Sequence, residues 1–182
     1  MDRREAILEA ALDAFAETGT TAIADVRTRS GASVGSIYHH FGGKEGIEAA
    51  LYVEILRRYQ EGVRRTLDDG PDAQAGVEAL VRHHLRWVGR NPERARFLFQ
   101  GGVARELEGE EIEELNQRLF AAIDAWVEQQ AGIRPMRREV FYAAVFGPAQ
   151  ELCRTWLAGR AKSLRRIEGE LAEAAWRAVR SD

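Results

Sequence analysis

Cysteine is almost absent from this sequence of 182 residues, which contains only Cys153. A single cysteine excludes an intramolecular disulfide framework and favours a reducing compartment, so we expect a cytoplasmic protein. A chain of this length buries roughly 70% of its unfolded surface and needs no covalent staple. No apolar run approaches the roughly 20 residues of a membrane helix, and the N-terminal segment lacks a cleavage-site pattern. We expect neither a signal peptide nor a membrane partner.

The sequence also lacks the signatures of catalysis and metal binding. It has no Glu-x-x-His pair of the kind that helical di-metal sites use. Its adjacent histidines, at 39–40 and 83–84, point about 100° apart around a helix and share no face. Cys153 has no identifiable base, and no glycine-rich phosphate loop follows a strand. We therefore expect no enzyme, no metal and no cofactor.

Positive charge is scarce for a nucleic-acid-binding protein. The formal net charge is −3. Residues 1–46 contain five basic side chains against seven acidic ones. Because bulk charge of this sign repels a polyanion, any DNA contact must depend on individually placed residues.

Hydrophobic positions recur with helical spacing, and the alternation typical of strands is absent. We predict an all-α fold of about nine helices. Three short helices come first: the second covers residues 25–29 with Thr20 and Thr21 as candidate N-caps, and the third follows Ser33 as its N-cap. Longer helices follow, the last beginning near Ser163. This pattern predicts a helix-turn-helix head, residues 1–47, and a ligand-binding and dimerisation body, residues 48–182.

The stretch SGASVGSIYHHFGGKEGI, residues 30–47, is the most informative in the chain. Two short helices joined by RSGAS have the geometry of a helix-turn-helix, in which Gly31 makes the tight turn. Helical spacing turns Ile37 and Phe41 towards the core. The residues left on the outer face are Val34, Gly35, Ser36, Tyr38 and His39.

Each outer residue suits contact with duplex DNA. Gly35 and Ser36 permit close approach to base edges, whereas Tyr38 and His39 can donate hydrogen bonds to phosphate oxygens. Lys44 lies in the first turn of the next helix, where free backbone N–H groups already favour an anion. The alternative is that these are ordinary surface residues of a helical domain.

The segments AILEAALDAFAETG and GASVGSIYHHFGGKEGI closely resemble the N-terminal region of the TetR family of bacterial transcriptional regulators. The resemblance covers about residues 3–52 and includes Tyr-x-x-Phe at the end of the recognition helix, followed by a Lys-Glu pair. It implies a homodimer that binds a near-palindromic operator in double-stranded DNA, usually as a repressor released by a small-molecule effector. The positions that match the family's DNA contacts are Thr21, Ser33, Gly35, Ser36, Tyr38, His39 and Lys44.

Three positions depart from the family's pattern, and one of them, Gly46, loosens the start of the helix that follows the recognition helix. Arg27 stands where the family commonly has a small alanine, so its side chain could reach a phosphate or pair with a neighbouring carboxylate. Val34 replaces a residue that is often polar, which would suit contact with a thymine methyl group. Arg27 and Val34 are included among the predicted DNA contacts.

The middle of the chain is rich in aromatic residues, which suits the apolar wall of an effector pocket. The same residues also suit an ordinary core. The predicted pocket comprises His84, Trp87, Phe97, Phe120, Trp126, Phe141, Phe146, Gln150 and Cys153.

The final helix carries more apolar surface than packing on its own subunit requires. Together with the preceding helix it could form a four-helix interface across a two-fold axis. The predicted interface comprises Leu152, Trp156, Leu164, Ile167, Leu171, Ala174 and Ala178. The alternative function is a helical DNA-binding or protein-interaction module with no effector, whose DNA binding would be indifferent to small molecules and to sequence.

Overall fold

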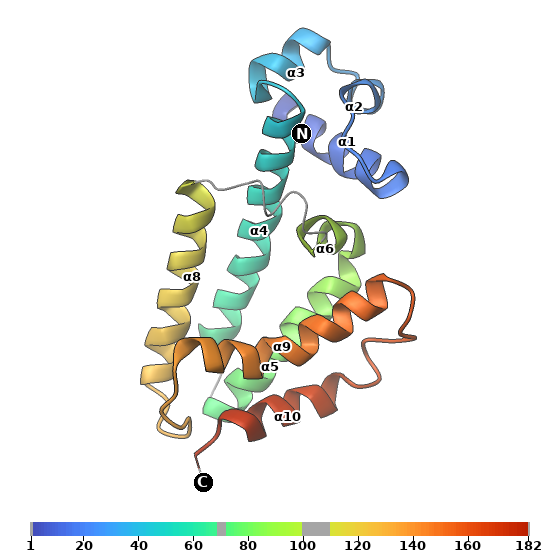
Figure 1. The fold of residues 1–182 in the computed structure, drawn as a ribbon. Coiled ribbons are helices and arrows are strands. Elements are labelled where there is room, and N and C mark those ends of the chain that lie inside the picture. The colour runs from blue at the N-terminus through green and yellow to red at the C-terminus, as the bar shows by residue number, and fades with distance from the viewer. Residues whose placement is uncertain (1, 69–71, 100–109, 182) are drawn as a thin grey trace. The chain divides into compact units, whose positions relative to one another are not determined.

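The computed structural model describes residues 2–68, 72–99 and 110–181. Regular structure in these ranges is helical, apart from one isolated bridge between Ile133 and Arg180 (Figure 1). The described helices number nine, which confirms the predicted all-α class. They are α1 (Arg3–Thr18), α2 (Ile23–Ser30), α3 (Val34–Phe41), α4 (Lys44–Asp68), α5 (Ala73–Arg90), α6 (Pro92–Phe99), α8 (Glu110–Glu128), α9 (Arg138–Leu157) and α10 (Glu168–Val179). None of the described helices is both long and apolar enough to cross a membrane.

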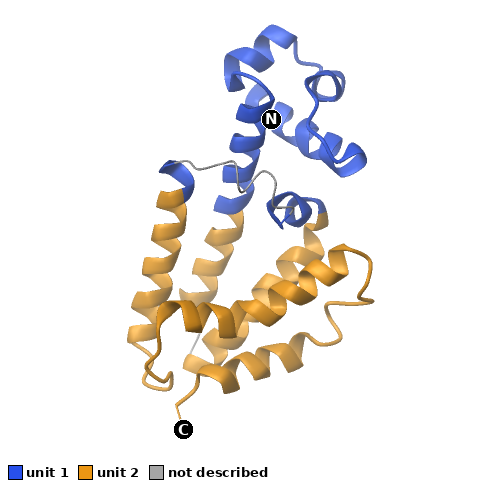
Figure 2. Ribbon diagram, in the orientation of Figure 1, with its two compact units in different colours: residues 1–57, 93–112 blue, residues 58–92, 113–182 orange. Residues whose placement is uncertain are grey.

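The chain forms two compact units (Figure 2). The first comprises residues 1–57 and 93–112, and the second comprises residues 58–92 and 113–182. Helix α4 contributes its first part to one unit and its remainder to the other. The division at residue 47 stays a prediction.

In the first unit, α1 packs on α2, and α2 on α3. Helices α1 and α2 end at Gly19 and Gly31, whose φ angles of 73° and 65° lie in the left-handed region that glycine adopts without steric cost. The turn at Gly31 follows the sequence prediction. The core of this helical head contains Ile7, Leu8, Ala11, Leu12, Val26, Ile37, Ile47 and Leu51.

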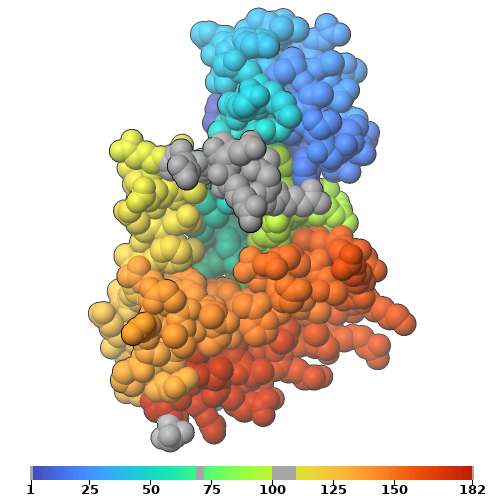
Figure 3. Space-filling view, viewed as in Figure 1, coloured from blue at the N-terminus to red at the C-terminus, as the bar shows by residue number. Residues whose placement is uncertain are grey.

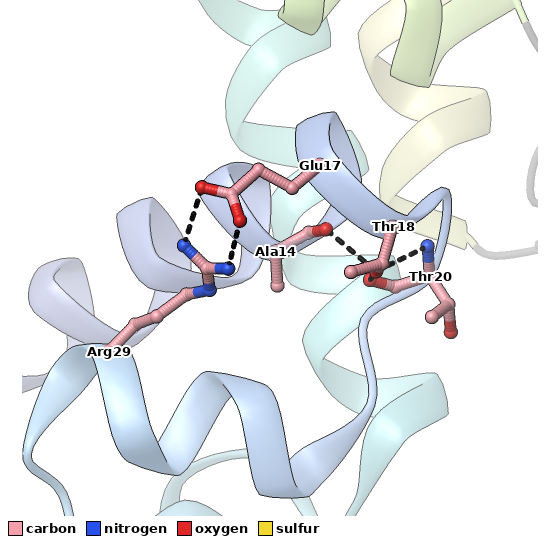
Figure 4. Close-up of polar contacts among 5 residues, drawn as sticks. All are labelled: Ala14, Glu17, Thr18, Thr20 and Arg29. Atoms are coloured by element: carbon pink, nitrogen blue, oxygen red, sulfur yellow. Dashed lines mark hydrogen bonds and ion pairs between the residues drawn. The ribbon is translucent and has the colours of Figure 1, made fainter.

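An ion pair on the surface joins α1 to α2 (Figure 4). Arg29 donates two hydrogen bonds to Glu17, with N···O distances of 3.0 and 2.5 Å. The hydrogen bond and the charge of Arg29 lower the pKa of the Glu17 carboxyl group. Because Arg29 is held in this pair, its charge is compensated within the head.

The caps predicted for α2 were wrong. The helix begins at Ile23, and its N-cap, Ala22, makes no side-chain capping bond. The threonines are engaged elsewhere: the backbone N–H of Thr20 donates to the Thr18 hydroxyl, with an N···O distance of 3.3 Å (Figure 4), and the Thr21 hydroxyl donates to Glu48. Tertiary contacts therefore replace the local capping bonds.

In the second unit, α5, α9 and α10 pack against one another, and the side chains of α9 and α10 meet in one continuous surface (Figure 3). Gly76 of α5 lies against the Trp126 ring; a Cβ atom there would lie 2.1 Å from a ring carbon. The core of this unit includes Val77, Leu80, Val81, Leu85, Ile123, Val145, Ala149, Cys153, Ala172 and Val179.

The last helix begins at Glu168, five residues later than the predicted start near Ser163. Gly159 lies in the segment between α9 and α10, and its φ of 73° is incompatible with continuation of α9. Leu164 is buried there beside Gly89 of α5. Burial of Leu164 outside a helix explains why helical periodicity placed this start too early.

Candidate nucleic-acid interface and effector body

Helix α3 has a defined N-terminus and a sharp division between its faces. The Ser33 hydroxyl accepts a hydrogen bond from the Ser36 backbone N–H at 3.1 Å, which confirms Ser33 as the N-cap. Ile37 is completely buried, whereas Val34 and Tyr38 are 44% and 53% exposed. Only one other large hydrophobic residue in the described chain, Val140, is comparably exposed. Val34 and Tyr38 lie one helical turn apart, so both are available for contact from the same face of α3.

Glycine at position 35 is not required by the fold. A Cβ atom there would meet only the Ser33 hydroxyl oxygen, at 3.9 Å. Its backbone is helical, so no positive φ demands glycine. His39 is exposed on the same helix. The small side chain at Gly35 therefore leaves space on the outside of α3, between residues that can contact a ligand.

Gly46 has the opposite property, and its importance was missed in the sequence. A Cβ atom at Gly46 would lie 1.7 Å from the carbonyl oxygen of Phe41, the last residue of α3. A backbone oxygen cannot move aside without moving the helix. Gly46 therefore permits the close approach of α4 to the end of α3 and so determines how the two helices pack at their junction.

Of the remaining predicted DNA contacts, Thr21 is buried, unlike the others. Its hydroxyl donates to the Glu48 carboxylate, and the Lys44 ammonium lies 3.6 Å from the same carboxylate oxygen. Arg27 is exposed, and no carboxylate among the described residues lies within ion-pair distance of it. Glu48 was missed in the sequence, although its i+4 spacing from Lys44 is a recognised signal for a helical ion pair.

The second unit contains a cluster of aromatic rings from α4, α5, α8 and α9. The Tyr59 hydroxyl lies 2.8 Å from Nδ1 of His84, and the Tyr59 ring contacts Trp87 at a centroid distance of 5.0 Å. Phe146 contacts His84 on one side and stacks on Tyr142 on the other. Tyr142 also contacts Phe120 and Phe141.

Burial keeps the polar members of this cluster uncharged. Desolvation, followed by the charge of His83, lowers the pKa of His84 to about 4. Desolvation raises the pKa of the Cys153 thiol to about 12 and also raises the pKa of Tyr59. At neutral pH the cluster is apolar and neutral, with hydrogen-bonding groups at a few fixed points.

The structure thus places five predicted pocket residues, His84, Trp87, Phe120, Phe141 and Phe146, in one cluster. Cys153 is buried close enough to Tyr59 to affect its pKa, and Gln150 is half-buried on the same helix. Trp126 packs over Gly76. Phe97 lies in the other compact unit, in edge contact with Phe15 at 5.0 Å.

A groove of about 380 Å³ runs beside this cluster, along α5 and the end of α4. Trp87 is the one predicted pocket residue in its lining. Arg82 is paired with Glu78 and Arg86 with Glu168, whereas Arg90 has no carboxylate partner among the described residues. The lining residues are Thr66, Ala79, Arg82, His83, Arg86, Trp87, Arg90 and Asn91.

A second, apolar hollow of about 200 Å³ lies among α5, α9 and α10. Three predicted interface residues line it: Leu171 is half-buried, and Ala174 and Ala178 are exposed. Leu152 and Trp156 are half-buried on α9. Leu164 and Ile167 precede α10 and do not belong to its helical stripe, which corrects the expectation that they do.

Comparisons with known proteins agree with these features. Residues 7–51 match the family model of bacterial regulatory proteins, tetR family. The HTH-type transcriptional repressor KstR2 of Rhodococcus jostii (strain RHA1) is 36% identical over 85 residues, which cover 43% of this chain and 40% of that protein. The match therefore spans about two fifths of the length of this curated relative.

Solved structures share the whole fold. A TetR family transcription regulator from Marinobacter aquaeolei VT8 superposes with a TM-score of 0.81 at 20% identity, covering 99% of this chain and 96% of that chain. The transcriptional regulator FadR from Bacillus subtilis in complex with stearoyl-CoA gives 0.75 at 17% identity, covering 94% and 96%. The sequence matches point to transcriptional regulators and not to enzymes. The helix-turn-helix head thus matches the tetR family of bacterial regulatory proteins over residues 7–51, and the whole chain has the fold of solved TetR family regulators.

Proposed function

We propose that the protein is a homodimeric transcriptional repressor that binds a near-palindromic operator in double-stranded DNA and is released by a small-molecule effector. The observation that carries the proposal is the outer face of α3, where Val34 and Tyr38 are exposed beside Gly35. A major groove admits an α-helix, and the small and apolar side chains of this face suit contact with base edges.

Dimerisation would place two copies of α3 on one duplex. One short helix reads too few base pairs, whereas two recognition helices about 34 Å apart reach successive major-groove faces. The exposed residues of α9 and α10 support an isologous contact between two copies. Val140 is 46% exposed on α9, and Ala174 and Ala178 are exposed on α10, so burial by a partner would remove apolar surface from water.

The proposed effector has an apolar body and an acidic group. The aromatic cluster around Tyr59 and His84 supplies an apolar environment, and the adjacent groove contains three arginines of α5. Arg90 is the one among them without a carboxylate partner in the described residues, which favours an added anion. Stearoyl-CoA, which FadR of Bacillus subtilis binds, is an example of this chemical class.

Selection of bound fragments from the source genome tests DNA recognition. The proposal predicts enrichment of a palindrome at moderate salt, bound by two chains. Enrichment of no common sequence would refute it. Replacement of Ala174 by Glu, which buries a charge at the proposed interface, should yield monomers in analytical ultracentrifugation and weaken binding to the palindrome.

Effector release is tested by titrating stearoyl-CoA into the protein–palindrome complex. The proposal predicts dissociation of the complex, and a weaker effect of the ligand on the Arg90→Gln variant. Arg160→Gln removes another exposed arginine, which lies outside the groove and likewise has no carboxylate partner among the described residues, and serves as the matched control. A complex indifferent to stearoyl-CoA and to other acidic amphiphiles would exclude this effector class.

A further inference from the structure

The carboxylate of Glu48 lies beneath two of the predicted DNA contacts. Its Oε1 atom accepts the hydrogen bond of the Thr21 hydroxyl and is 3.6 Å from the Lys44 ammonium. The Glu48 side chain is 19% exposed and that of Lys44 is 44% exposed. One partly buried acid thus holds both a buried hydroxyl and a lysine that faces solvent.

This arrangement alters what Lys44 offers to DNA. An isolated ammonium at a helix N-terminus attracts a phosphate through its own charge and through the free N–H groups of the first turn. A carboxylate at 3.6 Å compensates that charge. At longer range a phosphate is therefore attracted by the dipole of an ion pair, which is weaker than the attraction of an isolated positive charge. The other side chains of the head do not replace this compensated positive charge, because residues 1–46 contain more acidic than basic side chains.

We propose that Glu48 is a positioning residue that attenuates the phosphate affinity of the head by compensating Lys44. Phosphate contacts dominate binding to DNA of any sequence. When they are weakened, the contacts of α3 with base edges contribute a larger share of the free energy of operator binding. The inference rests on the proposed DNA-binding function and adds a residue that sets its strength.

Substitution of Glu48 by Gln isolates the charge. The Gln side chain has nearly the same shape and retains a carbonyl oxygen that accepts the Thr21 hydrogen bond. The buried hydroxyl therefore keeps a partner, and the fold should be preserved. Glu45→Gln is the matched control, because it removes the same charge one residue beyond Lys44, from an exposed side chain with no ion pair to Lys44 in the described residues.

The experiment measures affinity for the selected palindrome and for a scrambled duplex of equal length, between 50 and 200 mM salt. Each freed lysine steepens the salt dependence, log K against log[salt], by up to about 0.9, or about 1.8 per dimer. Glu48→Gln should therefore bind both duplexes about tenfold more tightly at 150 mM salt. In a Lys44→Gln background, the Glu48→Gln gain should fall to that of Glu45→Gln.

The outcomes separate the two proposals. If the wild-type protein binds neither duplex, the proposed function fails. If it binds, but Glu48→Gln gains no more than Glu45→Gln, or gains equally in the Lys44→Gln background, the inference about Glu48 is overturned. Should Glu48→Gln not fold, Lys44→Gln alone decides: a compensated lysine predicts an unchanged salt slope, and an uncompensated one a slope shallower by about 0.9 per protomer.

Discussion

Replacing Gly35 by leucine separates the demands of the fold from those of DNA recognition. Gly35 is the second residue of α3, and a Cβ atom there would meet only the Ser33 hydroxyl oxygen, at 3.9 Å. A leucine side chain would extend into solvent. Because glycine costs a helix interior roughly 0.8 kcal/mol relative to leucine, the free energy of unfolding should stay the same or rise by up to about that amount.

The same side chain would stand on the surface that we propose enters the major groove. Operator affinity should therefore fall at least about tenfold, which corresponds to roughly 1.4 kcal/mol of binding free energy. Urea unfolding followed by circular dichroism measures the stability, and fluorescence anisotropy on the selected palindrome measures the binding.

Gly169→Leu is the matched control for this substitution. Gly169 is also the second residue of its helix, α10, and a Cβ atom there would meet nothing within 4 Å. This variant should gain similar stability and bind the operator unchanged. If Gly35→Leu kept full operator affinity, the outer face of α3 would not be the recognition surface, and the reasoning would be refuted.

Three further predictions concern packing and protonation. Gly46→Ala should destabilise the head by about 1–3 kcal/mol, despite better helix propensity, because its Cβ atom would meet the Phe41 carbonyl oxygen; calorimetry showing higher stability would contradict that contact. The pKa of His84 is lowered from 6.5 to about 4, so the unfolded chain takes up a proton first as pH falls. Unfolding free energy should therefore drop by about 3 kcal/mol from pH 6.5 to 4, and urea titrations should show this loss reduced in His84→Gln. The pKa of Cys153 is raised to about 12, so its thiol should react with an aromatic disulfide at pH 8 about a thousandfold more slowly than in the unfolded chain; equal rates would show an accessible thiolate.

Local signals in the sequence predicted the features that depend on a few neighbouring residues. Glycine at position 31 predicted the tight turn that ends α2, and Ser33 predicted the cap of α3, because both effects act within one turn. The burial of Ile37 and the exposure of Tyr38 followed from helical periodicity.

Features that depend on distant parts of the chain were not predicted. Thr21 was assigned to capping or to DNA contact, but its hydroxyl is hydrogen-bonded to Glu48, 27 residues later. Gly46 was interpreted as a weak start to α4, although the close approach of a carbonyl from α3 requires glycine there. Phe97 was grouped with the effector pocket on composition alone, and tertiary packing places it against Phe15.

The most direct test of the central claim is the operator affinity and stability of Tyr38→Ala. Tyr38 is 53% exposed on α3, so its removal should leave the unfolding free energy within about 0.5 kcal/mol of the wild type and the dimer intact. Operator affinity should fall at least about tenfold. Unchanged affinity would contradict the claim that this face of α3 is the recognition surface. A chain that unfolds or dissociates would show instead that Tyr38 belongs to the protein's own packing.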